Sequence, residues 1–479
     1  MNTIDYIIIA VYLVSMFAWA IYIGLRETAD DFLIFSRKAP FILVIFSIIS
    51  TWVGVGTTVA TAASGYETGI SLGLTAMVGG IIGVIIAAWF APKLKWYGDK
   101  YQAHTIGDFF FSRYSKASHL ISSGWILIIY LLLTAAQFVG LTALLSVWTG
   151  FEFDVLIWFA AISTILYTAF AGIKSDFYTD FIHFTIMFIV LFIILLPMTI
   201  GDLGGISKLY ELPSTYFDPF AYGGVSFFIA GIIFGVGSIF VTMELWQKVY
   251  ASTTGTKAKY ALLISLSIIV LFYVISTFFG MSMKVLVPNL DDPNKALFAL
   301  MKNTLPIGIL GIGIAGFMAI FISTINSTIM VASATITKDF IININPLKYS
   351  EKQKLRFGRL STLVCGVISL IIAYIFPDLV KLSVNSLFML LIIVPAVIGG
   401  FFWKKATAKG ATYSLISGSL VLFIFLFIDT EKAFVPAFII SLLVFIFVSL
   451  YSKHNSNEDI EIVQGWKKSN NIVNNNIKL

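Results

Sequence analysis

The stretch STWVGVGTT, residues 50–58, interrupts an otherwise apolar segment with two glycines and four hydroxyl groups. Gly54 and Gly56 permit local unwinding of a helix, and the carbonyl oxygens released near Ser50 and Val53 could then coordinate a small hard cation. The same small residues also permit close packing of helices without any ligand, so both interpretations remain open. Tryptophans in membrane proteins usually lie at the membrane–water interface, but Trp52 is expected nearer the middle of the bilayer. This position favours a role in lining a cavity.

A second polar stretch follows the glycine-rich half of residues 305–340, where Ser323 and Thr324 begin a run of hydroxyl and amide side chains. Adjacent residues differ by about 100° around a helix, so both hydroxyls can point to one side. Two hydroxyls and several carbonyls would form an oxygen-only Na⁺ shell that binds weakly enough to release its ion. Alternatively, the hydroxyls bond to the preceding helical turn and need no ligand.

Acidic residues form the third feature. Asp180 lies a few residues inside an apolar span, where a carboxylate costs about 2.5–3.5 kcal/mol at helix centre and so indicates an ion-binding or structural role. Asp176, one turn earlier, is interpreted as an acid at the water interface near a helix N-terminus. The stretch containing Glu244 and Lys248 is interpreted as an interfacial charge cluster.

Two further polar residues lie inside apolar spans. We expect His183 to bond to a neighbouring carbonyl, with a proton relay as the alternative. Gln137 lies midway through another span and either faces a solute or bridges two helices.

The elements that hold these residues must be membrane helices. The chain has 479 residues, of which 58% are hydrophobic and only 12% charged, far more apolar side chains than a soluble core could bury. The net charge of +6 therefore reflects placement along a membrane rather than nucleic-acid binding. The single cysteine, Cys365, rules out an intrachain disulfide and a Cys-based metal site. The apolar run from Ile4 to Leu25 is too long for a signal peptide and is read as a retained helix.

Each span needs about 20 predominantly apolar residues. This length predicts thirteen spans, which start near residues 4, 41, 70, 119, 153, 177, 222, 260, 305, 357, 379, 410 and 433. Basic residues concentrate in alternate gaps, so the N-terminus is predicted outside and the C-terminus inside. Only six of the 31 Lys and Arg residues fall in the segments expected outside: Lys208, Lys284, Lys295, Lys302, Lys381 and Lys432.

The spans are predicted to form one transporter domain over residues 1–452, with no soluble domain attached. Residues 453–479 are polar and Asn-rich, and we expect a mobile cytoplasmic tail.

Four stretches make the chain resemble the sodium:solute symporter family over nearly its whole length: STWVGVGTTVATAASGYETG, AGIKSDFYTDFIHF, LWQKVYAS and AIFISTINSTIMVASATITKDF. The resemblance implies an all-α integral membrane protein of the LeuT type. Two inverted five-helix repeats would occupy residues 41–200 and 222–403, with an extra helix at 4–25 and two at 410–452. The first helix of each repeat would be unwound or bent at its centre.

The resemblance also implies the ligands of the family's principal sodium site. These are the backbone carbonyls of Ser50, Val53 and Ile320 and the hydroxyls of Ser323 and Thr324. Ile320 stands where the family often has Ala, a departure that a backbone ligand tolerates. Asp180 matches a Thr-Asp pair linked to cation binding and, in some members, to a second sodium site.

The implied function is sodium-coupled symport of a small organic solute, an amino acid or a related compound, into the cell. The solute would lie beside the breaks, near Trp52, Thr57, Gln137 and Thr242. Choline carriers share the Trp-Val-Gly run, but the further aromatic residues of a cation cage are not evident. Proline carriers place an acid just after the sodium ligands of this span, and this chain has Trp52 in that neighbourhood, so the identity of the solute stays open.

The expected partners are Na⁺, the solute and the lipid bilayer of a bacterial cell membrane. We expect no enzymatic activity, no other cofactor and no obligatory protein partner. The sequence contains no G-x-x-x-x-G-K-[ST] motif for ATP binding. Alternatives are a proton-coupled carrier of the same fold, a channel and a solute sensor. Loss of coupling in Asp180→Asn without any sodium effect would indicate the first of these.

Overall fold

The computed structural model describes residues 2–306, 308–344, 349–426 and 434–452, and within them all regular structure is helical. Ten helices in these ranges are long and apolar enough to cross a membrane, and three bent helix pairs raise the number of spans to thirteen. All thirteen predicted spans are therefore found. The predicted tail at 453–479 lies outside the described residues. The predicted sidedness of the termini and the exact repeat boundaries remain predictions.

Eight spans are single unbroken helices. They are α1 (Thr3–Gly24), α5 (Ser71–Tyr101), α7 (Lys116–Thr149), α8 (Phe153–Phe170), α13 (Gly255–Leu286), α16 (Glu351–Ile375), α19 (Ala408–Leu426) and α20 (Phe434–Tyr451).

Two further spans continue through a π-helical segment. They are α9 (Ile173–Phe188) with η3 (Ile189–Leu195) and α10 (Leu196–Leu203), and α15 (Ile309–Ala334) with η7 (Thr335–Ile342).

Three spans are bent by more than 40° at a short break. The first joins α3 (Phe41–Trp52) to η2 (Gly56–Ala60) and α4 (Thr61–Thr68), with a bend of 58°. The second joins α11 (Gly224–Ser238) to α12 (Met243–Ala251), with a bend of 41°.

The third bend, of 42°, lies in the span formed by α17 (Leu379–Met389), η8 (Leu390–Ile392) and α18 (Val394–Phe402). Bends in the first two spans were expected from the sequence, whereas this one was not. Pro395 in the first turn of α18 accounts for it, because proline lacks the amide hydrogen that continues a helix.

Shorter helices connect the spans. They are α2 (Ala29–Ile34), η1 (Phe35–Arg37), α6 (Ile106–Arg113), η4 (Ile206–Glu211), η5 (Ser214–Phe217), η6 (Pro293–Lys295) and α14 (Ala296–Thr304).

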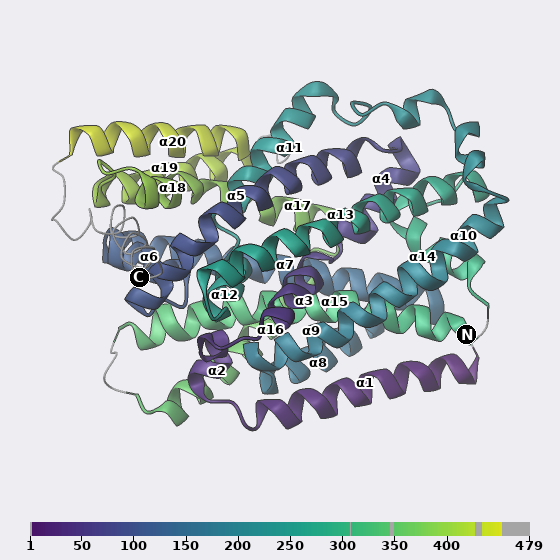
Figure 1. The fold of residues 1–479 in the computed structure, drawn as a ribbon, viewed down its shortest axis with the longest axis horizontal. Helices are drawn as coiled ribbons and strands as arrows, with labels where there is room; N and C mark the ends of the chain where they lie inside the picture. Colours follow the sequence, from purple (N-terminus) through teal and green to yellow (C-terminus); the bar gives the residue numbers. More distant parts are fainter. Residues whose placement is uncertain (1, 307, 345–348, 427–433, 453–479) are drawn as a thin grey trace, which may run out of the picture.

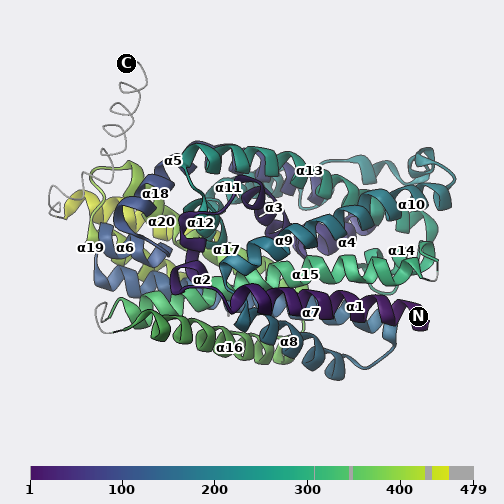
Figure 2. The same ribbon diagram turned by 60° about the horizontal axis from the view of Figure 1, so that its bottom comes forward.

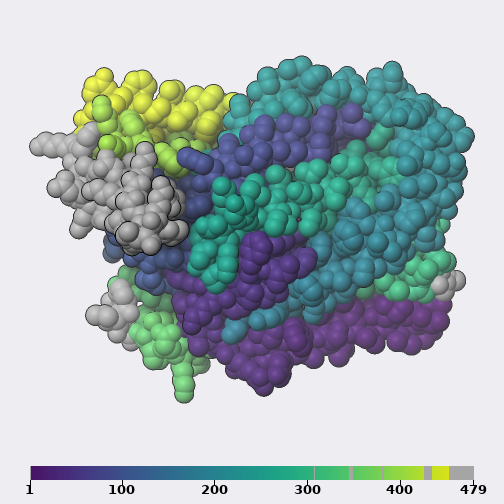
Figure 3. Space-filling model, in the orientation of Figure 1, coloured from purple at the N-terminus to yellow at the C-terminus, as the bar shows by residue number. Residues whose placement is uncertain are grey.

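The spans run side by side, and the two most buried ones form the centre (Figures 1 and 2). Over an apolar stretch of 18 residues in each span, 83% of the residues are buried in the α15–η7 span and 78% in α7, against 22% in α1. The space-filling view shows α1 along the lower edge and α19 and α20 at the upper left (Figure 3). Helices α1, α19 and α20 therefore flank a core in which α15 packs against α3, α7 and α9.

Although α1 lies at the edge, it is tied to the central helix through Asp5. The Asp5 carboxylate is fully buried and accepts hydrogen bonds from the backbone amides of Gly308 (3.0 Å) and Gly311 (2.9 Å). These amides belong to the first turn of α15, where a helix has no internal acceptors for its N–H groups. Asp5 thus caps α15 from a different span.

Candidate functional site

The centre of the site is the break in the α3–α4 span. Helix α3 ends at Trp52, and its capping residue Val53 has the non-helical angles φ −82° and ψ 70°. Among the described residues, no hydrogen bond reaches the backbone oxygens of Ser50 and Val53, although both residues are buried. A buried carbonyl without a donor is costly. These two oxygens are therefore suited to a cation.

The hydroxyl pair of α15 faces this break. Ser50 donates a hydrogen bond to the Ser323 hydroxyl (Oγ–Oγ 2.7 Å), and the Thr324 hydroxyl lies 3.3 Å from the backbone oxygen of Thr51. The Thr324 hydroxyl also lies 3.2 Å from the backbone oxygen of Ile320, one turn earlier. Ser323 and Thr324 thus reach across to α3, so bonding within their own helix does not account for both.

Glycine makes this close approach possible. A methyl group built on Gly54 would lie only 2.8 Å from the Thr324 Oγ1 and 3.5 Å from the Gln137 Oε1. Gln137 of α7 also lies beside the break, with its Oε1 3.5 Å from the backbone nitrogen of Val55. Gly56, two residues on, has open space around its Cβ position.

Asp180 of α9 closes the third side of the site. Its carboxylate is fully buried and accepts hydrogen bonds from Ser323 and from Ser47 of α3, each at 2.5 Å. One carboxylate therefore connects α9 with both helices that carry the predicted sodium ligands. Ser47 was not singled out in the sequence, because one serine in an apolar helix carries no distinctive pattern.

The charges near Asp180 are buried, in contrast to their predicted interfacial placement. Asp176 is 1% exposed and Lys248 of α12 is 3% exposed, and the Lys248 Nζ lies 3.0 Å from the Asp176 Oδ2 and 3.5 Å from the Asp180 Oδ2. Glu244 is also buried and accepts a hydrogen bond from the Tyr130 hydroxyl. The bend between α11 and α12 turns Glu244 and Lys248 inward, which local polarity could not reveal.

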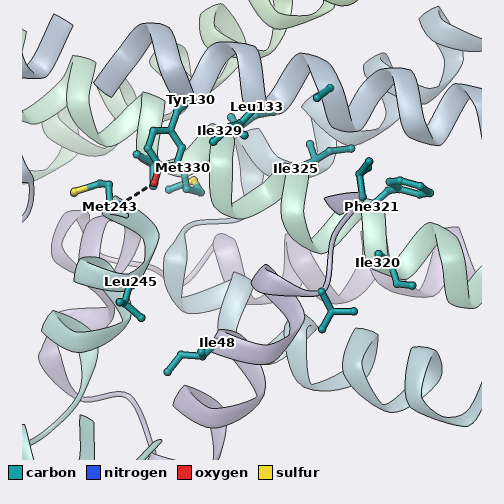
Figure 4. Close-up of a cluster of buried hydrophobic side chains, with 14 of the residues drawn as sticks. Ile48, Tyr130, Leu133, Met243, Leu245, Ile320, Phe321, Ile325, Ile329 and Met330 are labelled. Carbon is teal, nitrogen blue, oxygen red and sulfur yellow. Dashed lines mark hydrogen bonds between the residues drawn. The ribbon is translucent and has the colours of Figure 1, made fainter. Parts of the chain in front are cut away.

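Tyr130 of α7 holds the start of α12 in place. Its hydroxyl accepts a hydrogen bond from the backbone amide of Met243 at 2.8 Å (Figure 4).

A small hollow lies between α12 and α3. Its lining residues are Ile48, Thr51, Trp52, Glu244, Leu245 and Lys248.

The predicted solute residues are only partly brought together. Trp52 is half-buried and lines this hollow. The hydroxyl of Thr57 donates to the backbone oxygen of Trp52 (2.7 Å), and that of Thr242 donates to Ser238 (2.8 Å), so both are satisfied within their own span.

His183 departs from its prediction. It is fully buried on α9, and neither ring nitrogen has a hydrogen-bond partner among the described residues, so the expected carbonyl is missing. The ring of Tyr12 on α1 lies 6.2 Å away, centroid to centroid.

The donor atoms gathered here are hydroxyl, carbonyl and carboxylate oxygens. Within the described ranges, no group of three or more His, Cys, Asp or Glu side chains could hold a metal ion. Oxygen donors suit hard cations rather than transition metals. Broken helices that meet at an oxygen-lined site inside a membrane bundle define the class of secondary transporters with a LeuT-type fold.

Comparison with known proteins gives the family. The profile of the sodium:solute symporter family matches residues 33–418, and the chain belongs to this family. The sodium/pantothenate symporter of Escherichia coli is 25% identical over 468 residues, which cover 91% of this chain and 94% of that protein. A sodium/proline symporter of Staphylococcus aureus is 27% identical over 497 residues, covering 94% of this chain and 93% of the relative.

The fold is shared with a solved structure of a Na⁺-coupled sialic acid symporter in a substrate-bound, outward-open state. The TM-score is 0.84 at 18% sequence identity, over 95% of this chain and 99% of the other. The chain is thus a multi-pass membrane transporter, not an enzyme, and it couples the movement of a small solute to Na⁺.

Proposed function

We propose that Na⁺ binds between the break in α3 and the Ser323–Thr324 pair of α15, and that its entry drives uptake of a small organic solute into the cell. One observation carries the proposal: among the described residues, nothing donates a hydrogen bond to the backbone oxygens of the buried residues Ser50 and Val53, which lie in the span that Ser323 and Thr324 contact. The backbone oxygen of Ile320 completes the proposed shell.

Asp180 acts as a positioning residue for this shell. Because the Ser323 proton is donated to Asp180, the lone pairs of the Ser323 oxygen are free to face a cation. The negative charge behind the hydroxyl also favours a cation in front of it. The ion would replace the hydrogen bond that the Ser50 hydroxyl donates to the Ser323 oxygen, so that the Ser323 oxygen can face the ion.

Coupling follows from the position of the ion between two helices. Na⁺ holds α3 against α15 and thereby orders the break beside Trp52, where the solute is proposed to bind. This ordering raises the affinity for the solute. By thermodynamic reciprocity, the solute raises the affinity for Na⁺ by the same factor. Each Na⁺ that moves down a potential of about 100 mV adds roughly 2.3 kcal/mol to the driving force.

The solute is proposed to bind along Trp52 and Gln137, with Thr57 and Thr242 at the two breaks. Trp52 offers an apolar face, and Gln137 offers an amide that can donate and accept hydrogen bonds. A small amino acid or a related organic solute fits this combination. Proline and pantothenate, which the relatives' names specify, are the first compounds to test.

The test is sodium-dependent thermal stabilisation of the purified protein, combined with solute uptake into proteoliposomes. Ser323→Ala with Thr324→Ala should abolish the Na⁺-dependent rise in melting temperature and the Na⁺-driven uptake. Thr335→Ala is the matched control, because this buried hydroxyl on the same span donates to the backbone oxygen of Val331. Full sodium affinity in the double variant would refute the proposed site.

A further inference from the structure

Lys248 contributes a positive charge to the cation site from within the protein. Its ammonium group forms ion pairs with Asp176 (3.0 Å) and Asp180 (3.5 Å), and it also lies 3.4 Å from the Ser327 hydroxyl and 4.6 Å from the centre of the Phe177 ring. Lys248 comes from α12, whereas the two acids come from α9. A lysine shared by two acids at this depth is a specific arrangement, because a buried charge is strongly unfavourable unless it is paired.

The charge balance limits how many further cations can bind. With both acids ionised, Asp176, Asp180 and Lys248 together carry one net negative charge. One Na⁺ beside Ser323, whose hydroxyl donates to Asp180, brings the group to neutrality. A second Na⁺ on Asp180 would leave a net positive charge in a buried environment and would lie close to the ammonium.

Without the ammonium, the same residues would offer a second oxygen-lined cation site. Asp176 Oδ2 accepts a hydrogen bond from Ser327 (3.0 Å), and Ser327 in turn lies 2.8 Å from the Thr51 hydroxyl. The other carboxylate oxygen, Asp176 Oδ1, is buried and has no hydrogen-bond partner among the described residues. The carboxylates of Asp176 and Asp180 and the Ser327 hydroxyl are hard donors suited to Na⁺.

We propose that the Lys248 ammonium occupies the position of a second coupling cation, so that this transporter binds one Na⁺ and supplies the other positive charge itself. The inference rests on the sodium site proposed above. It assigns Lys248 a role in ion stoichiometry, distinct from the anchoring of α12, which Tyr130 provides at the other end of the same helix.

The test is to count bound ²²Na⁺ on the full-length protein in lipid nanodiscs at saturating Na⁺. The wild type should bind one Na⁺ with a Hill coefficient near one, and K248M should bind two with a Hill coefficient above one. K248M/D176N should return to one. D339N is the matched control, because Asp339 is a buried carboxylate that accepts hydrogen bonds from Thr105 and Ser123 and lies outside these ion pairs, and its count should stay at one.

The outcomes separate the two proposals. No bound Na⁺ in the wild type would refute the sodium site itself, whereas two would refute only the role of Lys248. A folded K248M variant that still binds one Na⁺ would also refute the proposed role of Lys248. If K248M does not fold, D176N gives a second test: its Lys248–Asp180 pair is neutral, so Na⁺ should bind at least about tenfold more weakly. Unchanged affinity in D176N would contradict the charge balance.

Discussion

Replacing Gly54 with alanine should weaken sodium binding by wedging apart the two helices that form the site. The added methyl group would lie 2.8 Å from the Thr324 Oγ1, whereas ordinary contacts begin near 3.4 Å, so the break must move by about 0.6 Å. Overpacking of this kind costs about 1–3 kcal/mol. If the cost falls on the sodium-bound state, affinity should drop roughly 5- to 150-fold, since 1.4 kcal/mol corresponds to a factor of ten.

The same break offers the matched control. Gly56 is exposed, and a methyl group there has no neighbour within 4 Å, so Gly56→Ala should bind Na⁺ within about twofold of the wild type. Affinity is measured by ²²Na⁺ titration, after size-exclusion chromatography has shown that both variants are folded. The reasoning is refuted if Gly54→Ala binds Na⁺ like the wild type, or if both variants lose affinity equally.

Two further predictions concern the edges of the bundle. Asp5→Ala removes the cap that α1 provides for the first turn of α15 and should lower the free energy of unfolding by about 1–3 kcal/mol. Asp5→Asn keeps a hydrogen-bond acceptor and should be less destabilised. Equal melting temperatures for the two variants would contradict this prediction. Glu27, in the connection after α1, accepts a hydrogen bond from the Ser175 amide, but burial raises its pKa from 4.5 to about 7. The folded state therefore binds this proton more tightly than the unfolded state, so stability should fall as pH rises from 4.5 through about 7. Glu27→Gln should flatten that part of the melting-temperature profile, and an unchanged slope would exclude Glu27 as its source.

Much of the fold could be predicted because the bilayer imposes strong rules on sequence. Apolar length determines where spans lie, and an interruption such as STWVGVG is tolerated only where freed backbone groups find partners. The break after Trp52 was predictable for this reason. The bend at Pro395 escaped notice because the surrounding residues are uniformly apolar.

The polar surroundings of the site were harder to predict, because they depend on how distant spans meet. Asp180 was identified because a carboxylate is energetically costly in an apolar span. Its partners are distant in the sequence: Ser47 lies 133 residues earlier, and Lys248 lies on α12. Lys248 lies near a span end in the sequence, which suggested an interfacial position. The bend of 41° before α12 instead directs it toward α9.

A high-resolution experimental structure determined in Na⁺, compared with one determined in K⁺, would show directly whether a sodium ion binds at the break in α3. We expect a sodium ion in direct contact with the backbone oxygens of Ser50, Val53 and Ile320 and the hydroxyls of Ser323 and Thr324. An ion bound elsewhere, with none in contact with these oxygens, would contradict the proposed site.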